Sequence, residues 1–310
     1  MFSITVVSLC CVIVRYYRSF TKTTSDDEGN IGVFMNPLHP RRPSLKNFLL
    51  FYKSQVPKRY SYSQIRSYTK NFTEKVGKGG FGTVYKGKLP SGCLIAVKML
   101  DKSKQSEHQF IAEVATVGMT YHVNLVRLFG YCSQGSKRAL VYEYMVNGSL
   151  DKYIHGDHQD ELDWKQLHSI AVGTARGIAY LHEDCRNRIL HCDIKPHNVL
   201  VDVDFFPKVG DFGLAQISDK NDTHISAAHG GTIGYAAPEM WSRMYGRVTD
   251  RSDVYSYGML LMEMVGGRRN FDNKHSRSSK SYYPQWVFKQ VEKGDFSNLK
   301  KGNMSEETRA

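Results

Sequence analysis

The pattern of apolar residues changes at about residue 148, and this change restricts the folds open to the chain. Before it, short runs rich in β-branched and aromatic residues predict strands over residues 83–85, 94–97, 125–129 and 140–142. After it, apolar side chains recur at helical spacing, as in Leu167, Ile170, Ala171, Thr174, Ile178 and Leu181. A mostly-β part followed by a mostly-α part predicts an α+β protein of two lobes with a cleft between them.

One helix is expected among the predicted strands. Ser106 and Gln109 have the spacing of a capping box, which predicts a helix start at Ser106. Phe110, Val114 and Val117 follow at helical spacing, so this side of the helix is expected to face the core.

Four glycines, Gly77, Gly79, Gly80 and Gly82, stand close together in the first lobe. Without a Cβ atom, such residues let the backbone approach phosphate closely. Taken alone, the G-x-G-x-x-G spacing also fits a dinucleotide-binding turn or an ordinary hairpin. Residues 84–92 have the pattern of strand, turn and strand, where a dinucleotide-binding fold would have a helix, so a glycine loop over phosphates is favoured.

Two charged residues of this lobe are expected to pair. Lys98 ends an apolar strand, and Glu113 lies three residues after Phe110 on the inward side of the predicted helix. A buried ammonium group needs negative partners, and a carboxylate and nucleotide phosphates would supply them. Each residue alone is more simply explained as a surface charge, so this interpretation depends on the other motifs of the chain.

A second set of polar residues comes after residue 190, at Asp193, Lys195, Asn198 and Asp211. Asp193 is the candidate base, which would accept a proton from a substrate hydroxyl or orient it. Lys195 would neutralise charge on a transferring phosphoryl group. Asn198 and Asp211 offer the hard oxygen ligands that suit Mg²⁺.

These motifs, with Ala237-Pro238-Glu239, resemble the signature of protein kinases over roughly residues 70 to 290. Residues 59–63, 140–150 and 211–215 resemble more narrowly the plant receptor-like kinases of the leaf-rust-resistance kinase-like group. The resemblance implies a two-lobed protein-kinase fold and a Ser/Thr protein kinase that uses ATP and Mg²⁺. Its partner would be a protein substrate with a Ser/Thr acceptor, because Lys195, two residues after the base, follows the Ser/Thr-type pattern.

The resemblance also implies roles for single residues. Tyr142 would lie behind the adenine, and Glu143 and Met145 would offer it backbone hydrogen bonds. Thr232 would help to position the base and the substrate, and Asp253 would brace the catalytic loop. The nucleotide site as a whole would comprise Val76, Gly77, Gly79, Gly80, Gly82, Val84, Ala96, Lys98, Glu113, Tyr142, Glu143 and Met145.

The N-terminus suggests a membrane location with the kinase domain facing the cytoplasm. Residues 1–14 are apolar or small, and Arg15 and Arg18 follow. This run is shorter than the ~20 residues of a full span, but its aromatic and basic flank resembles the cytoplasmic half of a transmembrane helix. A signal peptide fits less well, because no charged region precedes the run and no small-residue cleavage site follows it.

We therefore expect a partial transmembrane or anchor segment at 1–18, a disordered juxtamembrane linker at 19–58, a kinase domain at 59–300 and a polar tail at 301–310. The net charge is +12, with much of the excess near the N-terminus. Basic segments interleaved with aromatic residues, as in RNA-binding sheets, are absent from the sequence, so no nucleic-acid partner is expected. The six scattered cysteines favour a reducing compartment.

Two departures from the family pattern carry consequences. Cys192 stands where many kinases have an arginine that pairs with a phosphorylated activation loop. Activity is therefore expected to depend little on phosphate at Thr223, Ser226 or Thr232 through that contact. The helical lobe is expected to be truncated, which would deprive Glu239 of its usual arginine partner. The alternative function is then a nucleotide-binding, pseudokinase-like scaffold, inactive because of the truncation, and a third is a membrane-tethered decoy.

Overall fold

The computed structural model describes residues 56–80, 82–155, 162–218, 230–271 and 282–293. The chain divides into two compact units, residues 1–56 and residues 57–310, and the second unit contains both lobes. The expected membrane segment, most of the linker and the polar tail lie outside the described residues. Among the described helices, none is long and apolar enough to cross a membrane.

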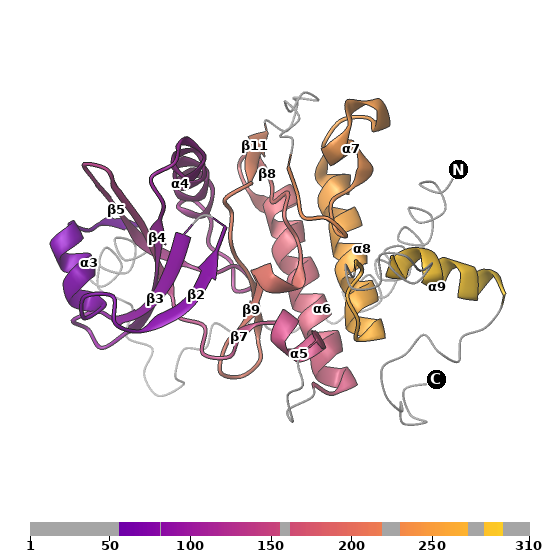
Figure 1. Ribbon diagram of the computed structural model, residues 1–310, viewed down its shortest axis with the longest axis horizontal. Coiled ribbons are helices and arrows are strands. Elements are labelled where there is room, and N and C mark those ends of the chain that lie inside the picture. The colour runs from indigo at the N-terminus through magenta and orange to yellow at the C-terminus, as the bar shows by residue number, and fades with distance from the viewer. Residues whose placement is uncertain (1–55, 81, 156–161, 219–229, 272–281, 294–310) are drawn as a thin grey trace, which may run out of the picture. The chain divides into compact units, whose positions relative to one another are not determined.

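The first lobe is built on a six-stranded sheet with the order β1-β5-β6-β4-β3-β2 (Figure 1). Its strands are β1 (Lys58–Arg59), β2 (Lys75–Gly79), β3 (Gly82–Lys88), β4 (Leu94–Leu100), β5 (Leu128–Gln134) and β6 (Lys137–Glu143). All neighbours are antiparallel except β1, which runs parallel to β5. The strand expected over 125–129 begins only at Leu128, because Leu125 forms an isolated bridge with Val209 instead.

The two faces of this sheet are covered by different helices. On β4, Ile95 and Val97 are fully buried on one face, where they pack with Ile65 of α3 (Tyr62–Tyr68). Because side chains alternate along a strand, Lys98 points to the other face. That face is covered by α4 (Lys104–Val117), whose Phe110 and Val117 belong to the main core, as expected from their spacing.

The expected capping box at Ser106 and Gln109 is wrong. The N-cap of α4 is Ser103, whose hydroxyl accepts the Ser106 N–H at 3.0 Å. Ser103 and Ser106 are both of a residue type that can cap a helix, but Ser103 stands three residues earlier and satisfies a free N–H group of the first turn. Gln109 is instead buried, with its amide beside Gly213.

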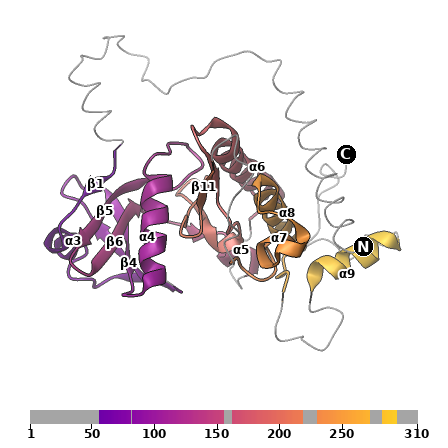
Figure 2. The ribbon, with the colours of Figure 1, turned by 90° about the horizontal axis from the view of Figure 1, so that it is seen from above.

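The second lobe is mostly helical, as predicted, and its core lies along α6 (Trp164–Ala179) and α8 (Asp250–Gly266) (Figures 1 and 2). The other helices are α5 (Asp151–His155), α7 (Pro238–Trp241) and α9 (Tyr283–Glu292), with shorter turns at Tyr180–Asp184, Pro196–Asn198 and Arg243–Tyr245. Five short strands complete it: β7 (Gly148–Ser149), β8 (Arg188–Leu190), β9 (Val199–Val201), β10 (Pro207–Val209) and β11 (Gln216–Ser218). The stripe from Leu167 to Leu181 is packed into this core.

Backbone hydrogen bonds tie the segment before β5 to β10 of the helical lobe. The Val126 N–H donates to the Val209 carbonyl at 2.9 Å, and the Val209 N–H donates to the Asn124 carbonyl at 2.8 Å. The Asn124 amide adds a bond to the Pro207 carbonyl at 3.0 Å. The two lobes are therefore joined at this point as well as through the chain that continues from β6.

Candidate active site

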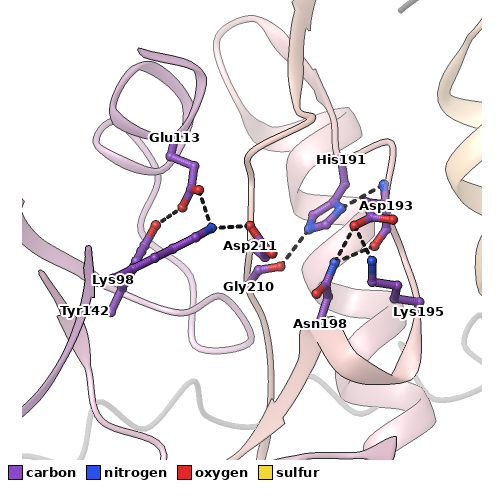
Figure 3. A network of polar contacts seen from close by, with 9 residues as sticks. All are labelled: Lys98, Glu113, Tyr142, His191, Asp193, Lys195, Asn198, Gly210 and Asp211. Carbon is purple, nitrogen blue, oxygen red and sulfur yellow. Dashed lines mark hydrogen bonds and ion pairs between the residues drawn. The ribbon is translucent and has the colours of Figure 1, made fainter. Parts of the chain in front are cut away.

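An ion-pair network connects the two lobes at Lys98. Its ammonium group lies 2.7 Å from Glu113 Oε1 and 2.6 Å from Asp211 Oδ1, and Figure 3 shows it between the two carboxylates. Lys98 comes from β4, Glu113 from α4, and Asp211 from the segment between β10 and β11. The pairing of Lys98 with Glu113 expected from the sequence is present, and Asp211 is a second partner.

The electrostatics of this network reflect its burial. Desolvation acts to lower the pKa of Lys98, but the two carboxylates outweigh it, and the pKa is raised. Burial raises the pKa of Glu113 to about 7, although the Lys98 ammonium opposes the change. Desolvation also opposes ionisation of Asp211, yet Lys98 holds its pKa below the ordinary value. Solvent weakens the last effect, because the Asp211 side chain is 40% exposed.

Tyr142 has a contact that the sequence did not predict. Its hydroxyl donates to Glu113 Oε2, while Lys98 occupies the other oxygen of the same carboxylate (Figure 3). The Glu113 side chain is fully buried, so both of its oxygens depend on these partners. The expected place of Tyr142 behind the adenine and its contact with Glu113 are compatible, because β6 is the neighbour of β4.

The second group of side chains surrounds Asp193. Lys195 Nζ lies 2.7 Å from Asp193 Oδ2, and the Asn198 amide donates to the same oxygen at 2.9 Å. The Thr232 hydroxyl donates to Asp193 Oδ1 at 2.6 Å and accepts from Lys195 Nζ at 2.8 Å. The structure thus brings together four residues that the sequence singled out, one of them from a segment 39 residues further along the chain.

Asp253 on α8 holds the backbone that carries Asp193. It accepts the N–H groups of His191 and Cys192, each at 2.8 Å, and lies 2.9 Å from His182 Nε2. Cys192 has a φ of 62°, an uncommon conformation for a residue with a side chain. Two hydrogen bonds to one buried carboxylate provide a physical reason for its persistence. The bracing contact expected of Asp253 is present.

His191 links the two groups of side chains; it stands two residues before Asp193 in the kinase signature, but its contacts were not predicted. Its Nδ1 accepts the Asp193 N–H at 3.2 Å, so Nε2 carries the proton and donates to the Gly210 carbonyl at 3.0 Å (Figure 3). The ring packs on Phe212, with centroids 4.8 Å apart. Its place between Asp193 and the Asp211-Phe212-Gly213 turn depends on the fold and has no signal in local spacing.

The four glycines divide into two kinds. A Cβ atom on Gly77, Gly79 or Gly80 would meet nothing within 4 Å, so open space lies beside this backbone. A Cβ on Gly82 would lie 2.1 Å from the Met99 carbonyl oxygen, so this glycine is required by strand packing.

The apolar residues expected at the nucleotide site lie on the neighbouring strands. Val84 is paired with Lys98 across β3 and β4, and Ala96 is two residues from Lys98 on the same face. Val76 on β2 is 46% exposed. The structure therefore places Val84 and Ala96 beside the lysine and leaves Val76 largely open to solvent.

The end of β6 has a network of its own. Both carboxylate oxygens of Glu143 lie 2.9 Å from Lys208 Nζ on β10, and Oε1 also accepts the Arg127 N–H at 2.7 Å. The Glu143 N–H donates to the Arg127 carbonyl, and the Met145 carbonyl accepts from the Gly148 N–H. This side-chain tie between the lobes was not predicted.

A divalent cation at this site would depend on Asn198 and Asp211. The Asn198 amide nitrogen bonds to Asp193, so its amide oxygen is the atom that could ligate a cation. Within the described ranges, no group of three or more His, Cys, Asp or Glu side chains could hold a metal. Two oxygen ligands fit Mg²⁺, which usually completes its shell with water and substrate phosphates.

The two departures from the family pattern can also be located. Cys192 is buried in an apolar cluster with Ala237 and Met240. Glu239 is half-buried and accepts the Ser252 hydroxyl at 2.7 Å. Thr223 and Ser226 lie outside the described residues.

Most of the chain is similar to known proteins. A family model described as "Protein kinase domain" matches residues 70–309. A leaf rust 10 disease-resistance locus receptor-like protein kinase-like protein (number 2.4) of Arabidopsis thaliana is 46% identical over 298 residues, which cover 95% of this chain and 46% of the relative. Rust resistance kinase Lr10 of Triticum aestivum is 49% identical over 253 residues, 80% of this chain and 40% of the relative.

A G-type lectin S-receptor-like serine/threonine-protein kinase of Arabidopsis thaliana is 50% identical over 252 residues, 80% of this chain and 28% of the relative. The chain thus spans less than half the length of each of these relatives. The family match covers most of the sequence and both groups of side chains around Lys98 and Asp193. The chain therefore belongs to the protein kinase domain family.

Proposed function

We propose that the chain transfers the terminal phosphate of ATP to Ser or Thr hydroxyls of proteins. The observation that carries the proposal is the position of Lys98, between Glu113 of one lobe and Asp211 of the other. An ammonium group held at this point by two carboxylates can orient nucleotide phosphates as they enter the cleft. Correct placement of this lysine–glutamate pair and of the aspartate is required for phosphoryl transfer in protein kinases.

The nucleotide would lie between the glycine loop and the end of β6. The open space beside Gly77, Gly79 and Gly80 can accept phosphate oxygens close to the backbone. Because the Glu143 N–H and the Met145 carbonyl have partners already, the adenine would be bound by the Glu143 carbonyl and the Met145 N–H.

Asp193 would orient the acceptor hydroxyl and take its proton. Its Oδ2 accepts from Lys195 and Asn198, whereas Oδ1 accepts only from Thr232 among these side chains. Since a carboxylate oxygen accepts about two hydrogen bonds, Oδ1 has capacity for the substrate. Lys195 Nζ, 2.7 Å from the carboxylate, is close enough to neutralise charge on the transferred group. Mg²⁺ at Asn198 and Asp211 would supply further charge neutralisation.

Ser/Thr specificity and membrane location are parts of the same proposal. Lys195 follows the base by two residues, as in Ser/Thr kinases, and one relative is named a serine/threonine-protein kinase. The apolar run at 1–14 and the basic residues after it support attachment to a membrane, with the kinase domain on the cytoplasmic side.

Transfer of radiolabelled phosphate from ATP to a protein acceptor tests the proposal. The full chain is compared with Asp193→Asn, which keeps the shape of the side chain and removes the base. We expect the variant to lose about 10²–10⁴-fold in rate, and the exposed Asp204→Asn to serve as a matched control with wild-type activity.

Equal labelling by the wild type and Asp193→Asn would refute the catalytic assignment. Nucleotide binding without any transfer would instead favour the pseudokinase-like scaffold. Analysis of the labelled amino acids tests the specificity, and label on tyrosine alone would refute the Ser/Thr assignment.

A further inference from the structure

The positive charge of the chain is concentrated in the β-rich lobe. Residues 57–143 contain 14 Lys or Arg and 5 Asp or Glu, a net charge of +9, whereas residues 144–310 have a net charge of −1. The excess is therefore not confined to the N-terminal segment, where residues 1–56 account for +4. No part of the proposed transfer reaction requires this asymmetry.

The basic residues at the start of this lobe are not balanced by acids. Residues 29–73 contain eight Lys or Arg and no Asp or Glu. The β5–β6 hairpin, which pairs with β1 and packs beside α3, also lacks acidic residues from Leu128 to Tyr142. Carboxylates that would neutralise these cations are thus missing both along the chain and on the adjacent strands.

Five exposed cations lie on α3 (Arg66), just after it (Lys70), on β1 (Lys58 and Arg59) and at the start of β6 (Lys137), and we call this surface the α3 face. Contacts hold the parts together, because Arg59 donates to the Ser133 carbonyl at 2.8 Å and Lys137 Nζ lies 5.1 Å from the centre of the Tyr62 ring. Among the ion pairs of the described residues, none includes a member of the α3 face. Their charge is therefore available to an external partner.

The α3 face lies away from the active site. Both views place α3 at the end of the β-rich lobe farthest from α6 and α8 (Figures 1 and 2). A large partner could therefore cover this end of the molecule and leave the cleft accessible.

We propose that the α3 face docks on the anionic phospholipid headgroups of a bilayer. The chain enters the lobe at this face, and only residues 19–57 separate it from the expected anchor at 1–18. A chain of 39 residues reaches at most roughly 130 Å even when fully extended, so an anchored chain would hold the face near the membrane surface at high effective concentration. Clusters of Lys and Arg beside an anchor are attracted to anionic lipids.

The composition of the face favours lipid over an acidic protein. A protein interface normally has apolar or aromatic side chains at its centre. Here the tyrosines Tyr60, Tyr62 and Tyr68 pack inward against the core of the lobe. The only large apolar side chain that is mostly exposed on the described residues from 56 to 73 is Val56, at 56%. A surface rich in charge and poor in apolar anchors fits mobile headgroups.

The test measures binding of the full chain to phosphatidylcholine vesicles with and without phosphatidylserine. One variant replaces the five cations of the α3 face by Gln. A matched control replaces five exposed cations of the helical lobe, with the same change in net charge, at Lys165, Arg176, Arg186, Arg251 and Lys293. Thermal unfolding of all three proteins verifies that these surface changes leave the fold intact.

We expect phosphatidylserine to strengthen binding of the wild type and of the control by about tenfold or more, in a salt-sensitive manner. The α3-face variant should lose this increment. An increment retained by the variant, or lost equally by the control, would overturn the proposal. Tighter binding of the wild type to polyglutamate than to phosphatidylserine vesicles at the same ionic strength, lost in the α3-face variant, would overturn it in favour of an acidic protein partner.

The proposal rests on the proposed membrane attachment and not on phosphate transfer. Binding to phosphatidylcholine alone reports the anchor, and the phosphatidylserine increment reports the α3 face. The two can fail separately, and kinase activity measured in solution is independent of both.

Discussion

The contact between Tyr142 and Glu113 leads to a prediction about pH. The change Tyr142→Phe removes only the hydroxyl that donates to Glu113 Oε2. Lys98 then remains as the single described donor to a carboxylate that is fully buried. We expect the variant to fold and to bind nucleotide less well near neutral pH, because the Lys98–Glu113 pair needs an ionised carboxylate.

The size of the effect follows from the cost of the lost bond. Burial already raises the pKa of Glu113 to about 7. A hydrogen bond to a charged group contributes about 1.5–3 kcal/mol, and loss of a bond to the ionised form raises the pKa of the carboxyl group. At about 1.36 kcal/mol per unit, the pKa of Glu113 should rise by a further ~1–2 units.

The assay is kcat/KM for ATP from about pH 6 to about pH 9, where a group of this pKa titrates. The acid limb of the profile should move to higher pH in Tyr142→Phe, and activity should recover as Glu113 ionises. The neighbouring Tyr144→Phe, whose ring lies under Lys86, is the control and should keep the wild-type profile. An acid limb that did not move would refute the role of the tyrosine hydroxyl.

The titration of Glu113 also predicts how stability depends on pH. A carboxyl group whose pKa is raised in the folded state binds its proton more tightly there than in the unfolded chain. The contribution of Glu113 to the free energy of unfolding is therefore largest below about pH 4.5 and falls as the pH rises toward about 7. Denaturant titrations of Tyr142→Phe should show that this fall extends to higher pH than in the wild type.

Three further changes test the packing around the site. Gly82→Ala should lower the melting temperature markedly, because its Cβ would collide with the backbone of the neighbouring strand. Gly79→Ala should leave the melting temperature unchanged and weaken ATP binding. Thermal unfolding with and without ATP compares the two variants. Lys208→Met should reduce the free energy of unfolding by about 1–2 kcal/mol in denaturant titrations, because it removes the bond to the partly buried Glu143; an unchanged value would exclude a stabilising role. Asp253→Asn should reduce kcat far more than it raises the KM for ATP, since the carboxylate braces the catalytic loop; wild-type kcat in a steady-state assay would contradict this.

Much of the site could be predicted because its residues are close in sequence. Asp193, Lys195 and Asn198 lie within six residues, so a single turn brings them together. The helical spacing that placed Phe110 in the core also placed Glu113 on the side that faces Lys98. Local rules were weaker where two residues satisfied them equally, as the helix start at Ser103 rather than Ser106 shows.

Contacts between distant segments could not be predicted in this way. Lys98 meets Asp211 across 113 residues, and Glu143 meets Lys208 across 65. The hydroxyl of Tyr142 reaches Glu113 only because β6 and α4 pack on each other in this lobe. The partner of a long polar side chain depends on which groups packing brings within about 3 Å, and spacing along the chain carries no such information.

The sequence by itself therefore determined the two-lobed architecture, the family and the residues at the centre of the site. These follow from periodicity and from motifs whose members act over a few residues. Only the tertiary structure decided how those residues are held: Tyr142 on Glu113, Asp211 on Lys98, and His191 between Asp193 and the carbonyl of Gly210. It also gathered the cations of the α3 face, because strand pairing brings Lys137 beside residues that precede it by about seventy positions.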